Sequence, residues 1–156
     1  MTAHLASYKG TQPGLSGLFN RAIRHGSRSI YSHTEICIGN PFESEVMCVS
    51  ASGVDGGVRS KMMRLSPEKW DIVPVPWVSD ERVLNVLDDE GWCGYDYRGV
   101  ARFAFPWLPD LLLMPSNEAW FCSELAAYIM GLDEPWRYAP AELHLIALAA
   151  MEWSNK

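Results

Sequence analysis

Trp120-Phe121-Cys122-Ser123-Glu124-Leu125 is the stretch that decides the fold, because here an apolar segment turns into a helix-patterned one. From Cys122 onward, apolar side chains recur three, four, seven and eight positions later, at Leu125, Ala126, Ile129 and Met130. This spacing predicts an amphipathic helix that ends near Gly131, with Cys122 in its first turn on the inward face. Free N–H groups and the positive dipole end gather at such a terminus and stabilise a thiolate. Cys122 is therefore a candidate nucleophile, although a cysteine on an apolar face is more often a small buried hydrophobe.

A cysteine nucleophile also needs a base, and the candidate is His33 in Tyr31-Ser32-His33-Thr34-Glu35. Residues 30–39 alternate in polarity, which predicts a strand with His33, Glu35 and Cys37 on one face. A strand histidine that faces a helix N-terminus across a packed interface can activate a thiol. The long separation in sequence is no obstacle, since such partners are neighbours in space. The alternative is a strand histidine whose hydrogen bonds are satisfied and which does no chemistry.

Length and composition predict one globular domain over residues 1–156. With 48% hydrophobic and 21% charged residues, the chain can bury a core without disulfides or metals. A net charge of -6 argues against nucleic acid as a partner, because phosphate binding needs clustered Lys and Arg. The longest apolar stretch, residues 143–151, is shorter than the ~20 residues of a membrane span. Residues 1–9 lack a secretory signal, so we expect a cytoplasmic protein.

The cysteine pattern predicts reduced thiols. Cys37, Cys48, Cys93 and Cys122 show no C-x-x-C spacing, and without an export signal a disulfide framework is not expected. No two cysteines are close in sequence and the histidines are scattered, so neither a zinc site nor another cofactor is predicted.

Alternation and turn residues predict a small antiparallel sheet. Its strands are expected at residues 30–39, 46–52, 58–65 and 70–77, the first two as an antiparallel pair. Asp55-Gly56-Gly57 is a tight turn, and Pro74 and Pro76 favour an edge position for the last strand.

Helices are expected on either side of this sheet, which makes the fold α+β. Besides the Cys122 helix, the pattern predicts helices over residues 16–25, 80–90 and 141–152. Gly26 would end the first, Ser79 would cap the second, and Pro140 would open the third. Residues 94–113 are aromatic and broken by prolines, and the sequence assigns them no element.

Four short segments follow one another along the chain: Ser32-His33-Thr34-Glu35-Ile36, Val58 after a glycine turn, Tyr95-Asp96-Tyr97 and Phe121-Cys122-Ser123-Glu124-Leu125. Together they resemble the circularly permuted NlpC-type, papain-like cysteine hydrolases. In the common arrangement the cysteine helix precedes the histidine strand, whereas the permuted branch has the reverse order, as here. The resemblance covers roughly residues 32–131. It implies a papain-like fold with Cys122 as nucleophile and His33 as general base.

The resemblance also implies a third polar residue that orients the imidazole, and several candidates remain open. Ser50 occupies the expected place on the neighbouring strand, but serine is a weak orienting group. Glu35 shares a face with His33, yet two residues apart on one strand the two side chains would lie alongside each other. Glu43 and Glu45 could reach His33 if the turn folds back. We favour Glu35, because a carboxylate on the histidine face of an apolar strand needs an explanation; otherwise it lies in the cleft or at its rim.

Substrate contacts are expected from Tyr95, Tyr97 and Ser50, although aromatic residues in such a segment are more often packing. The oxyanion hole would use the backbone N–H of Cys122 and a second donor that the sequence does not identify. Arg59 could form a salt bridge or bind a substrate carboxylate.

The resemblance implies a thiol hydrolase that acts on a small peptide or acyl substrate through an acyl-enzyme. Relatives occur in bacteria and phages, which suggests peptidoglycan-type peptides. A cell-wall role would need export or lysis-coupled release, and the sequence shows no signal for either, which leaves a cytoplasmic amidase, esterase or thiol acyltransferase acting on lipid open. A hypothesis from another class is a non-catalytic binding module on the same fold. No metal is expected, and the oligomeric state is left open.

Overall fold

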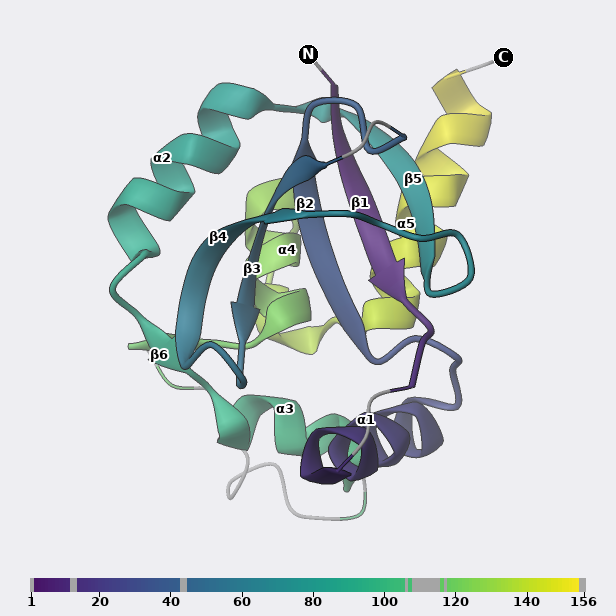
Figure 1. Ribbon diagram of the computed structural model, residues 1–156, viewed down its shortest axis with the longest axis vertical. Helices are drawn as coiled ribbons and strands as arrows, with labels where there is room; N and C mark the ends of the chain where they lie inside the picture. Colours follow the sequence, from purple (N-terminus) through teal and green to yellow (C-terminus); the bar gives the residue numbers. More distant parts are fainter. Residues whose placement is uncertain are drawn as a thin grey trace.

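The computed structural model describes residues 2–11, 14–42, 45–105, 107, 116 and 118–154. Within these ranges the chain forms five α-helices packed around a curled seven-stranded sheet (Figure 1). The strands are β1 (Thr2–Tyr8), β2 (His33–Ile38), β3 (Val46–Ser52), β4 (Gly57–Met63), β5 (Trp70–Ser79), β6 (Gly94–Tyr95) and β7 (Ala119–Trp120). The helices are α1 (Gly14–Ser27), α2 (Asp80–Glu90), α3 (Tyr97–Ala104), α4 (Cys122–Met130) and α5 (Pro140–Ser154), with a 3₁₀ turn η2 (Pro135–Arg137). The protein is thus mixed α+β, as predicted.

The sheet contains the predicted strands but is larger than expected. Its order is β5-β1-β2-β3-β4-β6-β7, and all neighbours are antiparallel except β6 and β7, which are parallel. The antiparallel β2–β3 pair, the turn before β4 and the edge position of β5 confirm the predictions. Strand β1, which lies between β5 and β2, was not predicted. Its Ala and Ser side chains have little strand preference of their own, so its neighbours determine its conformation.

The two faces of the sheet bury different residues, because successive side chains on a strand point to opposite sides. One face, which includes Leu5, Ile36 and Val49, packs against α2, α4 and α5, and these three helices cover it. In Figure 1, α4 and α5 lie behind the central strands. The other face of β2 carries Glu35 and Cys37, and a second apolar cluster lies beside them. The predicted alternation of β2 is confirmed.

Helix α4 begins at Cys122, as predicted, and ends at Met130 with Gly131 in the left-handed conformation at φ 77°. It is not the amphipathic helix that the spacing predicted, since eight of its nine residues are buried. The reason is tertiary: the sheet, α2, α5 and η2 all pack on it and enclose nearly every side. The N-terminus of α4 therefore lies inside the protein.

Helix α1 extends beyond the predicted residues 16–25, and the prediction that Gly26 ends it was wrong. Gly26 lies within the helix, where a Cβ would come 1.7 Å from the carbonyl oxygen of Phe103 in α3. The two helices lie side by side in Figure 1. Gly26 is thus explained by the close approach of two backbones rather than by helix termination.

We expect Gly26→Ala to destabilise the protein by about 1–3 kcal/mol, because the added methyl group must push α1 away from α3. This loss would outweigh the ~1 kcal/mol that alanine gains over glycine within a helix. Urea denaturation measures the effect. The matched control is Gly94→Ala, whose Cβ would meet no atom within 4 Å. A Gly26→Ala protein as stable as the wild type would contradict the described helix contact.

The unassigned segment after Cys93 provides β6 and α3. Asp96 caps α3, because its Oδ1 accepts hydrogen bonds from the N–H groups of Arg98 and Gly99 at 3.0 and 2.9 Å. Its Oδ2 accepts the N–H of Ser116 at 2.8 Å. Residues 106 and 108–113 of that segment lie outside the described residues.

The other predicted helices are confirmed. Ser79 caps α2 by accepting the N–H of Arg82 at 3.1 Å, and Pro140 is the first residue of α5. Within the described ranges, no helix combines the length and apolar character that a membrane crossing requires.

Candidate functional site

The site lies where two elements begin. His33 is the first residue of β2, Cys122 is the first residue of α4, and α4 packs on β2. The Cys122 thiol and the His33 imidazole lie near enough for each to shift the pKa of the other. The structure therefore brings together the two residues that the sequence analysis singled out, across a separation of 89 positions (122 minus 33).

Glu35 continues this contact on the other side of the imidazole. Its Oε1 lies 2.8 Å from His33 Nε2, which leaves Nδ1 of the ring for another partner. The expectation that these side chains merely lie alongside each other was wrong. Residues two apart on a strand lie on the same face roughly 7 Å apart at their backbones, and the two long side chains bridge that gap. Glu35 is thus placed as a group that orients the imidazole.

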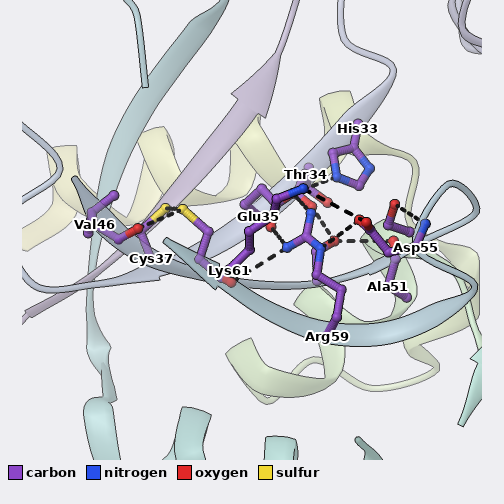
Figure 2. Close-up of polar contacts among 12 residues, drawn as sticks. His33, Thr34, Glu35, Cys37, Val46, Ala51, Asp55, Arg59 and Lys61 are labelled. Atoms are coloured by element: carbon purple, nitrogen blue, oxygen red, sulfur yellow. Dashed lines mark hydrogen bonds and ion pairs between the residues drawn. The ribbon is translucent and has the colours of Figure 1, made fainter. Parts of the chain in front are cut away.

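Arg59 in turn holds Glu35. From β4 it reaches across β3, and its Nη1 and Nη2 donate to Glu35 Oε2 and Oε1 at 2.6 and 2.5 Å. Its Nε also donates to Asp55 Oδ2 at 3.0 Å. Figure 2 shows Glu35 between the His33 ring and the Arg59 guanidinium. Of the two alternatives for Arg59, the structure has the salt bridge.

Burial makes this arrangement costly unless every charge is paired. Glu35 is 1% exposed. Burial alone would raise the pKa of Glu35, but hydrogen bonds from His33 and Arg59 outweigh it and lower the pKa. The carboxylate is therefore ionised at neutral pH and can stabilise a positive imidazole.

The thiol and the imidazole shift each other's pKa values in opposite directions. Burial alone would lower the pKa of His33, but the charges of Cys122 and Glu35 outweigh it and raise the pKa to about 10. Burial would raise the pKa of Cys122, but His33 and backbone hydrogen bonds from Thr34 and Ser123 lower it. Because the two groups interact, they titrate together as a pair and not independently. Together the two shifts favour a thiolate beside an imidazolium.

A pocket of about 860 Å³ adjoins the pair, with His33, Glu35 and Arg59 among its lining residues. Two aromatic pairs also line it: Tyr8–Trp70, with ring centroids 4.9 Å apart, and Tyr95–Tyr97, at 4.8 Å. Cys122 itself is only 2% exposed. It is not among the residues that line the pocket, whereas its partner His33 is.

The predicted substrate-contact residues differ in position. Tyr95 lines the pocket and lies near the thiol, since burial and the Cys122 charge both raise its pKa. Tyr97 also lines the pocket, and its hydroxyl donates to the Gly53 carbonyl at 2.9 Å. Ser50 does not line this pocket: it is buried and donates to the Thr34 carbonyl at 2.6 Å, which fixes the β2 backbone beside His33.

The remaining candidates for the orienting residue do not compete with Glu35. Ser50 has its hydroxyl on a backbone carbonyl, and Glu45 is exposed. Glu43 lies outside the described residues. In the described part of the chain, no three His, Cys, Asp or Glu side chains gather as metal ligands would.

Sequence reasoning did not identify Arg59 as the partner of Glu35. A usable signal existed, because the turn at Asp55-Gly56-Gly57 sets the register of β4 and places Arg59 opposite Ser50. What the pattern could not supply is the reach of the guanidinium across β3 to β2.

Comparison with known proteins identifies no relative: no family model matches the chain, and a search of curated proteins finds no match.

Proposed function

We propose that this chain is a thiol hydrolase with Cys122 as nucleophile, His33 as general base and acid, and Glu35 as the orienting residue. The observation that carries the proposal is the series of interactions in which the Cys122 thiol and His33 shift each other's pKa, His33 contacts Glu35, and Glu35 accepts hydrogen bonds from Arg59. Nucleophile, base and orienting group in hydrogen-bond contact are what thiol catalysis requires. The proposal includes a permuted papain-like, NlpC-type fold, which the order of histidine strand and cysteine helix supports.

The chemistry follows from the charge state of the pair. The Cys122 thiolate attacks the carbonyl carbon of an amide or ester, and the carbonyl oxygen takes up the negative charge. His33 then gives its proton to the leaving nitrogen or oxygen, and an acyl-enzyme remains on the sulfur. His33 next takes a proton from water, whose oxygen attacks the thioester and releases the carboxylic acid and the thiolate. Glu35 keeps the ring in position throughout.

The surroundings supply binding and stabilisation. The backbone N–H of Cys122, at the N-terminus of α4, would donate to the oxyanion, where the helix dipole also favours negative charge. The pocket volume of about 860 Å³ falls in the range of small-ligand sites, roughly 300–1,000 Å³. Tyr95 and Tyr97 would contact the acyl group, which can belong to a small peptide or an acyl ester.

Alkylation by iodoacetamide as a function of pH tests this proposal. We expect Cys122 to label with a midpoint clearly below the ~8.5 of a free thiol, because its pKa is lowered. Cys93, whose pKa is raised to about 11 by burial and by Glu90, should stay unlabelled in the folded protein. Intact mass gives the extent of labelling, and peptide mapping gives its position.

Cys122→Ser is the control and should remove the label. A panel of activated acyl esters and small peptide amides then separates esterase from amidase activity. If Cys122 labels no faster than the other thiols at any pH, the hydrolase proposal is wrong and the binding-module hypothesis stands in its place.

A further inference from the structure

Cys37 and Cys48 occupy directly opposite positions on two neighbouring strands. β2 and β3 are antiparallel, and their register pairs Cys37 with Cys48. The two sulfur atoms are 3.3 Å apart, and both residues are fully buried. In Figure 2 the sulfur of Cys37 lies beside a second sulfur atom, to which a dashed line joins it. Ten residues lie between the two cysteines in the sequence, and this spacing alone did not suggest that they form a pair.

The backbone geometry is compatible with a disulfide between them. Directly opposite residues on antiparallel strands have Cα atoms roughly 4.5–5.5 Å apart, within the ~4.4–6.8 Å that disulfides span. The sulfurs must approach from 3.3 Å to about 2.05 Å, which small side-chain rotations can provide. The closed disulfide therefore fits the observed register of β2 and β3.

We infer that Cys37 and Cys48 are a redox site that closes to a cross-strand disulfide within the folded protein. The other two cysteines have different partners: Cys93 donates to Glu90 Oε2 at 3.2 Å, and Cys122 contacts His33. Cys37 and Cys48 are the two thiols that the structure places sulfur to sulfur. This inference does not rest on the proposed hydrolase activity.

The reaction partner is a low-molecular-weight disulfide such as oxidised glutathione. One protein thiol, as thiolate, attacks a glutathione sulfur; a mixed disulfide forms and one glutathione thiolate leaves. The second protein thiol, after losing its proton, attacks the protein sulfur of the mixed disulfide and expels the second glutathione. The two protein thiols lose two electrons and two protons, and one glutathione disulfide becomes two glutathione thiols.

Burial makes this pair slow to react, in contrast to Cys122. The hydrogen bond to Cys48 and burial raise the pKa of the Cys37 thiol well above its ordinary value, and the nearby Glu35 adds to this effect. Oxidation therefore requires a transient opening of the β2–β3 pair. The product should be correspondingly protected from reductants.

The closed disulfide would constrain the unfolded chain across the 37–48 loop. For a loop of about 12 residues in a chain of this size, the melting temperature should rise by roughly 5–10 °C. Because β2 carries both His33 and Glu35, the link would stabilise the strand on which the candidate site is built.

The test uses Cys93→Ser/Cys122→Ser, which leaves only this pair, alongside the wild-type protein. Both are equilibrated in glutathione redox buffers, alkylated under denaturing conditions and mapped by mass spectrometry without reduction. We expect a cross-linked peptide containing Cys37 and Cys48, with a rise in melting temperature that dithiothreitol reverses. The matched control, Cys37→Ser in the same background, should show neither.

Two results would overturn the inference. One is full alkylation of both thiols after oxidation, or glutathione adducts and intermolecular links in place of the internal one. The other is a cross-link that leaves the melting temperature unchanged or lowers it. If the double variant does not fold, the peptide map of the oxidised wild-type protein tests the inference. In that map the peptides that contain Cys93 and Cys122 are identified separately from the Cys37–Cys48 cross-link.

Discussion

Replacing His33 with alanine should lower the rate of Cys122 alkylation at pH 7 by roughly 30-fold or more. In the wild type the imidazolium holds the buried thiol in its ionised form, since the charge of His33 is what outweighs burial. Without it, burial alone acts on a residue that is 2% exposed, and the thiol pKa should rise above that of a free cysteine. The full pH profile of the labelling rate measures both effects.

The matched control is His25→Ala, which removes an exposed histidine of α1 and should leave the profile unchanged. Thermal unfolding of both variants checks that the fold is retained. An unchanged labelling profile in a folded His33→Ala protein would show that His33 does not set the charge of the thiol. The proposed catalytic pair would then be wrong, whatever the distance between its members.

Replacing Arg59 with methionine should destabilise the protein by about 3 kcal/mol at neutral pH. Methionine keeps much of the side-chain volume but leaves Glu35 buried without its two guanidinium hydrogen bonds. The pKa of Glu35 is lowered in the fold, so its ionised form contributes stability that is fully present above the ordinary value of 4.5 and is lost as pH falls through the lowered pKa. In the variant, protonation removes the unpaired buried charge of Glu35. The difference in free energy of unfolding between wild type and variant should therefore become smaller from pH 7 to pH 4.

Urea denaturation at both pH values measures this, and two further variants make it specific. Glu35→Gln/Arg59→Met should be more stable at pH 7 than Arg59→Met alone, because it removes the stranded charge. Arg137→Met disrupts the exposed pair with Glu134 and should change the midpoint little. The described burial of the Glu35–Arg59 pair would be contradicted if wild type and Arg59→Met differed little in free energy of unfolding, or if the difference did not depend on pH.

Much of the fold could be predicted because local signals and the final packing agree. Ser79 caps α2, the glycine turn sets β4, and Pro74 and Pro76 lie in the edge strand β5. Where the prediction failed, tertiary contacts decide. β1 has weak strand residues between two strong neighbours, and Gly26 is required by a helix that passes close to it.

The candidate site was predictable only in part, for the same reason. The Cys122 helix start and the His33 strand each have a periodic signature, so both residues could be named. The Glu35–Arg59 ion pair has none, because it depends on how far two side chains extend over an intervening strand. The Cys37–Cys48 contact likewise depends on the register of β2 and β3, which follows from a turn whose length the sequence suggested only approximately.

The integrity of the sheet depends on β1, which lies between β5 and β2. It pairs with β2 on one side and with β5, more than 60 residues further along the chain, on the other. Trimming or disrupting residues 2–8 would therefore divide the sheet in two, with β5 on one side and β2, which carries His33, on the other. A strand with none of the proposed catalytic groups thus holds the two parts of the sheet together.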